Sequence, residues 1–370
     1  MKRILKWVGI ALPLLLVAWF TVAYFRSDNA CSSPDRGTPA HPVKAIVYCD
    51  YGLADVLKLE NVEKPVAEAG QIVVKVRAAA ANPLDWHMMR GTPYVMRFGT
   101  GLRRPTELRL GVDYAGVIES VGPGVTQFKP GDEVFGARTG AFGEYVAAKA
   151  DGTVVPKPAN ISFAQAAAVP VAAITALQGL RAGGVGAGTT VLINGASGGV
   201  GTFAVQIAKA LGAEVTGVCS TRNVELVRSL GADAVIDYTQ ADYTTGNVRY
   251  DMILDNVGNH GLLANRHALT PEGKYVLIGG GGPENGTWIG PMINPFKAML
   301  LSPFIKQDME VLFASLSRDD LAELSRLMAE GKVTPVIDRS YSLGEVPEAI
   351  RYLETGRARG KVIISEPDHE

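Results

Sequence analysis

The chain has 370 residues, with 36 Lys and Arg against 37 Asp and Glu, and 47% of its residues are hydrophobic. This length exceeds what one hydrophobic core usually serves, so we expect about two domains. The formal net charge of -1 gives no electrostatic reason to expect nucleic acid, and Cys31, Cys49 and Cys219 form no CxxC pair, which excludes a zinc ribbon and a dense disulfide framework.

Residues 1–26 are predicted to form a membrane anchor. Trp7–Phe25 is 19 residues long and carries no charge. As a helix it would be about 28 Å long, close to the hydrocarbon thickness of a bilayer. A cleaved signal peptide ending at Ala23 is the alternative, because such peptides also contain an apolar segment. Residues 27–42 are polar and contain proline, which is typical of a linker.

A β-rich domain is predicted over residues 43–163. Short apolar or alternating runs are separated there by Gly/Pro turns. From about Ser162 the apolar residues recur at helical spacing, and strands then alternate with helices. This alternation indicates a parallel sheet covered by helices on both faces, which we place at residues 164–308.

Residues 309–370 are predicted to return to the β-rich domain. Two helical stretches are expected, around Met309–Glu330 and Val346–Thr355. The strand that follows Gly331 has no partner in the parallel sheet, and we therefore expect it to join the first domain.

The sequence LINGASGGVG, Leu192–Gly201, places four glycines between an apolar run and a helix. In a strand–turn–helix setting, backbone N–H groups and the helix dipole bind pyrophosphate. A tight turn without a ligand is the alternative. The predicted dinucleotide contacts are Gly195, Ala196, Ser197, Gly198, Gly199, Val200 and Gly201.

The end of the next strand indicates which dinucleotide is bound. An NAD site usually has an acid about 20 residues further on, but none lies between Val215 and Val224. Ser220, Thr221 and Arg222 instead offer hydroxyls and a guanidinium that suit a 2′-phosphate. A solvated arginine at a helix start is the alternative. We predict NADPH as the cofactor.

Together with the residues above, several longer motifs resemble those of the medium-chain dehydrogenase/reductase superfamily, in particular of its zinc-free quinone oxidoreductase branch. They are LRLGVDYAGVIESVGPGVTQFKPGDEVFG, AAVPVAAITALQGL, LGADAVIDY, DNVG and SLGEVPEAIRYLETGRARGKVIIS. The resemblance covers Val43–Ser365 and implies a GroES-like catalytic domain, a doubly wound α/β Rossmann domain, a cleft between them and a homodimer. It also implies cofactor contacts by Thr175, Tyr238, Val257, Gly258 and Gly279.

Two positions indicate whether the chain has a zinc site. Zinc-dependent relatives carry a Cys near the start of the domain and a His in a GHE motif, where this chain has Asn82 and Val112. Valine cannot bind a metal, so we predict no metal site. A zinc-type NAD(P)-dependent alcohol dehydrogenase with unusual ligands is the alternative.

Without a zinc Lewis acid, hydride addition to a quinone or to the β-carbon of an enone is favoured over alcohol oxidation. The negative charge then spreads over an enolate or hydroquinone oxygen, and a few hydrogen-bond donors suffice. NPLDWHMMRGTPY supplies the candidate catalytic residues Asn82, Asp85, His87 and Tyr94. The alternatives are structural: a turn at Asn82, a helix cap at Asp85 and a core position for His87.

The sequence thus predicts an NADPH-dependent quinone or enone oxidoreductase, with walls of the substrate pocket around Met96–Arg109 and Trp288–Phe304. A catalytically inactive NADPH-binding membrane sensor or scaffold is the alternative. The anchor would make it a single-pass membrane protein. Lys2, Arg3 and Lys6 favour an enzyme on the far side of the membrane, but because NADPH is cytoplasmic we expect the catalytic domain on the cytoplasmic side.

Overall fold

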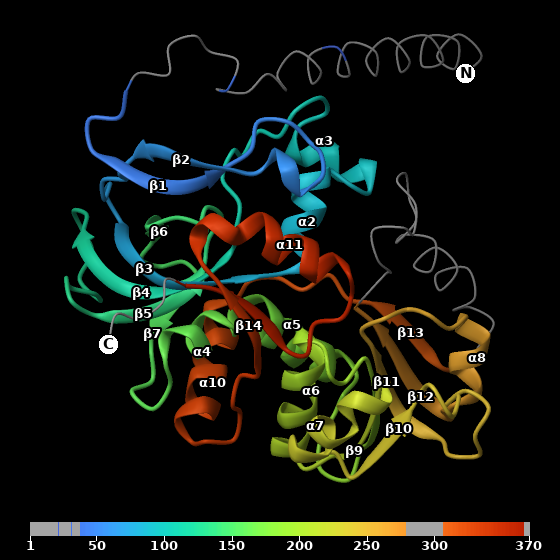
Figure 1. Cartoon of the computed structure of the whole chain (residues 1–370). Helices are drawn as coiled ribbons and strands as arrows, with labels where there is room; N and C mark the ends of the chain where they lie inside the picture. The colour runs from blue at the N-terminus through green and yellow to red at the C-terminus, as the bar shows by residue number, and fades with distance from the viewer. Residues whose placement is uncertain (1–20, 22–30, 32–37, 279–305, 366–370) are drawn as a thin grey trace, which may run out of the picture.

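The computed structural model describes residues 21, 31, 38–278 and 306–365. They form two bodies that lie side by side, a β-rich one at the upper left of Figure 1 and an α/β one at the lower right. The C-terminal segment, in red, runs back from the second body to the first.

The β-rich body is built on a seven-stranded sheet in the order β14-β15-β3-β4-β5-β7, with β6 also paired to β3. A separate antiparallel pair, β1 with β2, is bridged to the segments before β6 and β4 at Ala45–Gly143 and Val47–Arg109. The strands are β1 (Pro42–Val47), β2 (Lys58–Glu63), β3 (Gln71–Ala81), β4 (Asp113–Val121), β5 (Glu133–Ala137), β6 (Tyr145–Lys149), β7 (Val154–Pro156), β14 (Ile337–Tyr341) and β15 (Lys361–Ile364).

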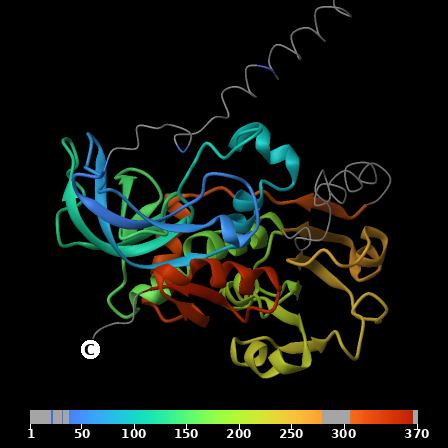
Figure 2. The same ribbon diagram turned by 45° about the horizontal axis from the view of Figure 1, so that its top comes forward.

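Short helices close the ends of this body. Figure 1 and Figure 2 show α2 and α3 on the side of β1 and β2. The helical elements are η2 (Ala54–Val56), α2 (Pro83–Arg90), η3 (Tyr94–Met96), α3 (Arg97–Thr100), α4 (Phe163–Ala167), η7 (Leu343–Glu345) and α11 (Val346–Glu354).

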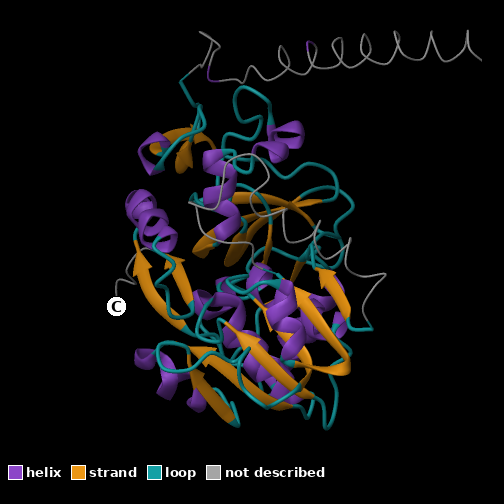
Figure 3. Cartoon of the chain, turned by 90° about the vertical axis from the view of Figure 1, so that its right-hand side faces the viewer, coloured by secondary structure: helices purple, strands orange, loops and turns teal. Residues whose placement is uncertain are grey.

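The second body is a six-stranded parallel sheet in the order β10-β9-β8-β11-β12-β13. Helices cover both of its faces (Figure 3). The order reverses between β8 and β11, and such a switch point is where open α/β sheets bind dinucleotides. The elements are α5 (Pro170–Ala182), β8 (Thr190–Asn194), α6 (Gly199–Ala210), β9 (Glu214–Cys219), η4 (Thr221–Asn223), α7 (Val224–Ser229), β10 (Ala234–Asp237), β11 (Tyr250–Asp255), α8 (Leu262–His267), β12 (Leu269–Leu277), β13 (Asp308–Val311) and α10 (Arg318–Ala329).

The segment after the second body differs from the predicted helix around Met309–Glu330. Asp308–Val311 is a strand, β13, parallel to β12 at the edge of the sheet. Helix α10 begins only at Arg318, where the side chain of Ser317 caps it by accepting a hydrogen bond from Asp320 N at 3.2 Å. Met309 and Val311 therefore belong to the sheet, and residues 312–317 connect it to the helix.

The prediction of a transmembrane helix is corrected. Among the described residues, none of the helices has the length and apolar character needed to cross a membrane. Helix α5, with 13 residues, would span about 20 Å, against about 30 Å of hydrocarbon. Of Trp7–Phe25, only Thr21 belongs to the described residues. The predicted single-pass membrane localisation, with its cytoplasmic orientation and membrane partner, is withdrawn with the helix.

Candidate active site

The glycine-rich turn lies at the carboxyl end of β8, at the switch point of the parallel sheet. Gly195 has φ +77°, a conformation that side chains disfavour. A Cβ on Gly201 would lie 2.1 Å from the carbonyl oxygen of Gly195, so only glycine fits at that position. Helix α6 then begins at Gly199, after Gly198 at its N-cap. Because its four glycines carry no side chains of their own, this turn can bring its backbone against a phosphate.

Two buried amide oxygens flank this turn and have no hydrogen-bond partner among the described residues. Asn223 donates from Nδ2 to Ser197 Oγ at 2.9 Å, and its Oδ1 has no partner. Asn256 donates to the backbone oxygen of Asn194 at 2.9 Å, and its Oδ1 also has no partner. A buried polar atom without a partner is costly. A bound dinucleotide, whose ribose hydroxyls are donors, fits this turn and these two acceptors.

Ser220, Thr221 and Arg222 follow β9 at the same edge of the sheet. The Arg222 guanidinium donates to the backbone oxygen of Arg357 at 2.7 Å. Thr221 Oγ1 donates to Asp237 at 2.6 Å, which lowers the pKa of that carboxyl. Asp237 ends β10, the strand next to β9, so the tertiary structure brings an acid to a place where the local sequence has none.

Two of the other predicted cofactor contacts, Val257 and Gly258, lie in the loop after β11 at the same edge. A Cβ on Gly195 would lie 2.8 Å from Val257 Cγ2, and Gly258 follows Val257 in the chain. Both backbone N–H groups donate to Asp255 Oδ1 at 2.9 Å, which fixes this loop. Thr175 is buried and donates to the oxygen of Val171, whereas Tyr238 is exposed. Ala196 is buried, Val200 is half-buried in α6, and Gly279 lies outside the described residues.

A buried charged network joins the two bodies. Lys361, 3% exposed at the start of β15, donates to Asn82 Oδ1 at 2.5 Å and lies 3.5 Å from Asp113 Oδ2. Asn82 donates in turn to Asp113 Oδ2 at 2.9 Å. The other oxygen of Asp113 accepts from Val171 N at 3.0 Å, near the start of α5. Burial lowers the pKa of Lys361 and raises that of Asp113, while their mutual attraction opposes both shifts.

Lys361 also reaches the glycine-rich turn. A Cβ on Gly199 would lie 3.3 Å from Lys361 Cδ. The neighbouring Gly360 N donates to the backbone oxygen of Ser197 at 3.0 Å. The structure therefore puts the Lys361 side chain beside the N-terminus of α6, with its ammonium group held by Asn82 and Asp113. The sequence prediction missed this residue, although its GK pair lies within the quoted motif SLGEVPEAIRYLETGRARGKVIIS.

Asn82 and Asp85 cap helix α2. For Asp85, a helix cap was the structural alternative to a catalytic role. Asp85 Oδ2 accepts from Asn82 N at 2.7 Å, in a capping box. Both side chains are buried, and Asp85 Oδ1 has no hydrogen-bond partner in the part of the chain that the structure describes. Desolvation raises the pKa of Asp85 to about 7. Asn82 is thus occupied by Lys361 and Asp113, so its amide is not an open donor for a substrate.

His87 and Tyr94 lie on either side of the turn after α2. The His87 ring stacks on Trp86, and its Nδ1 lies 2.6 Å from the carbonyl oxygen of Thr92. A carbonyl only accepts, so this nitrogen carries the proton. Desolvation lowers the pKa of His87, which favours the neutral ring. Tyr94 is half-buried, and the guanidinium of Arg97 lies 4.5 Å from its ring centre.

A metal site would need several donor side chains close together. In the described part of the chain, no group of three or more His, Cys, Asp or Glu side chains could hold a metal ion. Val112, the residue at the place of the family's histidine, is buried next to Asp113.

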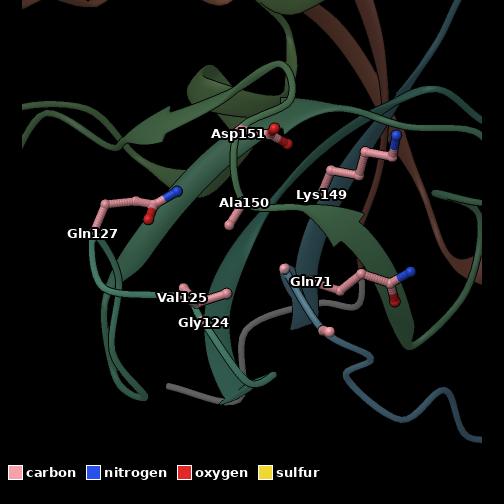
Figure 4. A pocket seen from close by; sticks show the side chains of 9 residues that line it. Gln71, Gly124, Val125, Gln127, Lys149, Ala150 and Asp151 are labelled. Atoms are coloured by element: carbon pink, nitrogen blue, oxygen red, sulfur yellow. The ribbon is translucent and has the colours of Figure 1, made fainter.

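A cavity of 330 Å³ opens at the far end of β3, away from this site (Figure 4). Gln71, at the start of β3, and Lys149, at the end of β6, line it, whereas Asn82 follows the other end of β3. The cavity is therefore separate from the glycine-rich turn and its neighbours.

Comparison with known proteins agrees with this arrangement. Family models match residues 68–159, as an alcohol dehydrogenase GroES-like domain, and residues 230–364, as a zinc-binding dehydrogenase. A 2-methylene-furan-3-one reductase of Solanum lycopersicum is 34% identical over 95% of this chain and 85% of its own length. A chloroplastic NADPH-dependent alkenal/one oxidoreductase of Arabidopsis thaliana is 34% identical over 87% and 79%.

Among solved structures, the quinone oxidoreductase from Coxiella burnetii matches with a TM-score of 0.76 and 29% identity, covering 88% of this chain and 99% of that one. The predicted Rossmann and GroES-like fold is thus confirmed, apart from the transmembrane helix. The chain belongs to the medium-chain dehydrogenase/reductase superfamily, in its zinc-free quinone oxidoreductase branch, and is an oxidoreductase that uses a nicotinamide cofactor.

Proposed function

We propose that this protein reduces quinones or α,β-unsaturated carbonyl compounds with NADPH. The observation that carries the proposal is the glycine-rich turn at the switch point, with Lys361 beside it. The names of the relatives, for alkenals, alkenones, a methylene-furanone and quinones, support this acceptor class. The bound nicotinamide supplies the hydride.

The cofactor preference rests on Arg222. Its guanidinium lies at the end of β9, held by the oxygen of Arg357, and can bind a 2′-phosphate with charge-assisted hydrogen bonds. The neighbouring acid, Asp237, already accepts hydrogen bonds from Thr221 and Thr239. We therefore expect NADPH to bind more tightly than NADH. Lys361 would add a positive charge beside the pyrophosphate.

On the acceptor side, the proposed donor is the Tyr94 hydroxyl. His87 in its neutral form has its proton on Nδ1, where Thr92 accepts it, so its Nε2 is an acceptor and cannot stabilise an oxyanion. His87 instead holds the turn that carries Tyr94. A hydrogen bond from Tyr94 to the acceptor oxygen would stabilise the charge that develops as the hydride is added.

The test is NADPH and NADH oxidation by the purified full chain, with a panel of quinones and a panel of enones, each with and without a metal chelator. We expect chelator-resistant turnover that is faster with NADPH. Tyr94→Phe should lower kcat with little change in the dissociation constant of NADPH, and His87→Phe, which cannot bond Thr92, is the comparison for a positioning role. NADPH binding without any turnover would favour a sensor or scaffold, and chelator-sensitive alcohol oxidation would favour the zinc-type enzyme.

A further inference from the structure

A disulfide joins Cys31 to Cys49, with Cα atoms 5.7 Å apart. These two residues lie outside the glycine-rich turn and the buried charged network. Cys49 is two residues beyond the end of β1, at the start of the loop Cys49–Gly52 that leads towards η2. The disulfide therefore ties the chain before β1 to this loop.

The loop Cys49–Gly52 is fastened to the segment 91–108, which follows α2. Asp50 pairs with Arg104, with 3.0 Å between Oδ1 and Nε. Tyr51 donates its hydroxyl to the backbone oxygen of Gly101 at 2.7 Å. At the two edges of the loop, Gly52 N donates to Met89 O at 3.1 Å and Tyr48 N donates to Leu108 O at 3.0 Å.

One cation links this loop to the proposed hydrogen-bond donor. The guanidinium of Arg97 lies 4.3 Å from the ring centre of Tyr51 and 4.5 Å from that of Tyr94. Its Nε also donates to the oxygen of Gly91 at 2.8 Å. The place of the Tyr94 ring therefore depends, through Arg97, on a tyrosine two residues from Cys49.

The same segment presents apolar surface near Tyr94. Val95 and Phe98 are 43% and 50% exposed. Apolar surface beside a polar donor is what an enone or quinone ring needs. The segment 91–108 is thus suited to be the acceptor wall of the site.

We infer that the Cys31–Cys49 disulfide positions this acceptor wall, by holding the loop Cys49–Gly52 against the segment 91–108. The inference rests on the proposed function insofar as Tyr94 and its neighbours face the acceptor. A dithiol can open the disulfide through a mixed disulfide. Two electrons and two protons pass to the cysteines, giving two thiols, and the dithiol becomes a disulfide. Once the disulfide is open, the acceptor wall loosens, while the glycine-rich turn keeps its contacts.

The first experiment is limited trypsin digestion of the full chain, followed at the Arg103–Arg104 bond. Arg103 is exposed, whereas Arg104 is held by Asp50. Cleavage of a transiently opened segment follows its open population. We expect dithiothreitol, or the double variant C31S/C49S, to raise the cleavage rate about tenfold or more, the change that about 1.4 kcal/mol of opening free energy gives.

The second experiment is kinetic, on the same samples. We expect the KM for a bulky enone to rise several-fold, with the dissociation constant of NADPH unchanged and kcat changed less than KM. C31S/C49S treated with dithiothreitol is the matched control, and it should not respond further. The remaining thiol, Cys219, is buried and its pKa is raised to about 11 by desolvation, so it is a poor nucleophile.

Asp50→Asn keeps the disulfide and weakens only the pair with Arg104, so it should shift cleavage and KM in the same direction. It tests the contact between the loop and the wall separately, and if C31S/C49S does not fold, the wild type with and without dithiothreitol decides the role of the disulfide. Unchanged cleavage and KM in the reduced protein and in the variants would overturn the inference. Faster cleavage in a protein that reduces no acceptor would keep the positioning role and refute the proposed function. Equal weakening of NADPH binding would show a general loss of structure, and would also overturn the inference.

Discussion

Lys361→Met is the change that probes the junction between the two bodies most directly. It removes the cation that lies between Asn82 Oδ1 and Asp113 Oδ2 and replaces it with an apolar chain of similar length. Asp113 is then a buried charge, 0% exposed, that keeps only its hydrogen bonds from Asn82 and Val171. We expect the protein to lose stability and to bind NADPH more weakly.

The size of the loss follows from the geometry. Removing one partner of a buried ion pair costs about 3–5 kcal/mol, because the other charge stays buried. Here the ion-pair distance is 3.5 Å and Asp113 keeps two donors, so we expect the lower end, about 3 kcal/mol. In the double variant Lys361→Met/Asp113→Asn both charges are gone. Its loss should be smaller than the sum of the two single losses by about 1–3 kcal/mol.

The assay is urea unfolding of the four proteins without cofactor at pH 7.5, followed by fluorescence and by circular dichroism. Coincident transitions are needed for each free energy of unfolding to be defined. Additive losses, within about 0.5 kcal/mol, would refute the view that Lys361 and Asp113 act as one pair. NADPH titration of the stable variants then separates the stability effect from the effect on the cofactor.

Three further predictions concern the cofactor and the acid of α2. Arg222→Gln should weaken NADPH binding about 10- to 100-fold, because one charge-assisted hydrogen bond is lost, and should leave NADH binding unchanged. Fluorescence titration measures the dissociation constants of both cofactors. An equal loss of affinity for the two would contradict the role of Arg222. Gly201→Ala puts a methyl group 2.1 Å from the oxygen of Gly195, so it should cost about 1–3 kcal/mol or more and abolish the rise in melting temperature with NADPH; a normal rise would contradict the close approach. Asp85, whose pKa is raised to about 7 by desolvation, binds its proton more tightly when folded, so its contribution is full below about pH 4 and is lost as the pH rises through 7. The free energy of unfolding should therefore fall by roughly 2–3 kcal/mol more in the wild type than in Asp85→Asn between pH 5 and pH 8, and parallel pH profiles of the two would refute this assignment.

The local parts of the fold, including the glycine-rich turn, were accessible from sequence. The turn Gly195–Gly201 could be placed because glycine spacing after a buried strand reports a backbone requirement that holds within ten residues. Strand and helix periods likewise report which face of each element is buried. The exception, β13, is short and is followed by a helix, so periodicity alone did not separate the two. The expected homodimer, the domain boundaries and the roles of individual site residues stay predictions.

Pairs of residues far apart in the chain were decided only by the tertiary structure. Lys361 contacts Asn82, 279 residues away, because β15 lies antiparallel to β3, so that the start of β15 lies beside the end of β3. Asp237 meets Thr221 because the parallel strands β9 and β10 end at the same edge. The sequence by itself determined which backbone could receive a dinucleotide, since that depends on local sterics. Which charges surround it depends on strand pairing, and no local pattern records that.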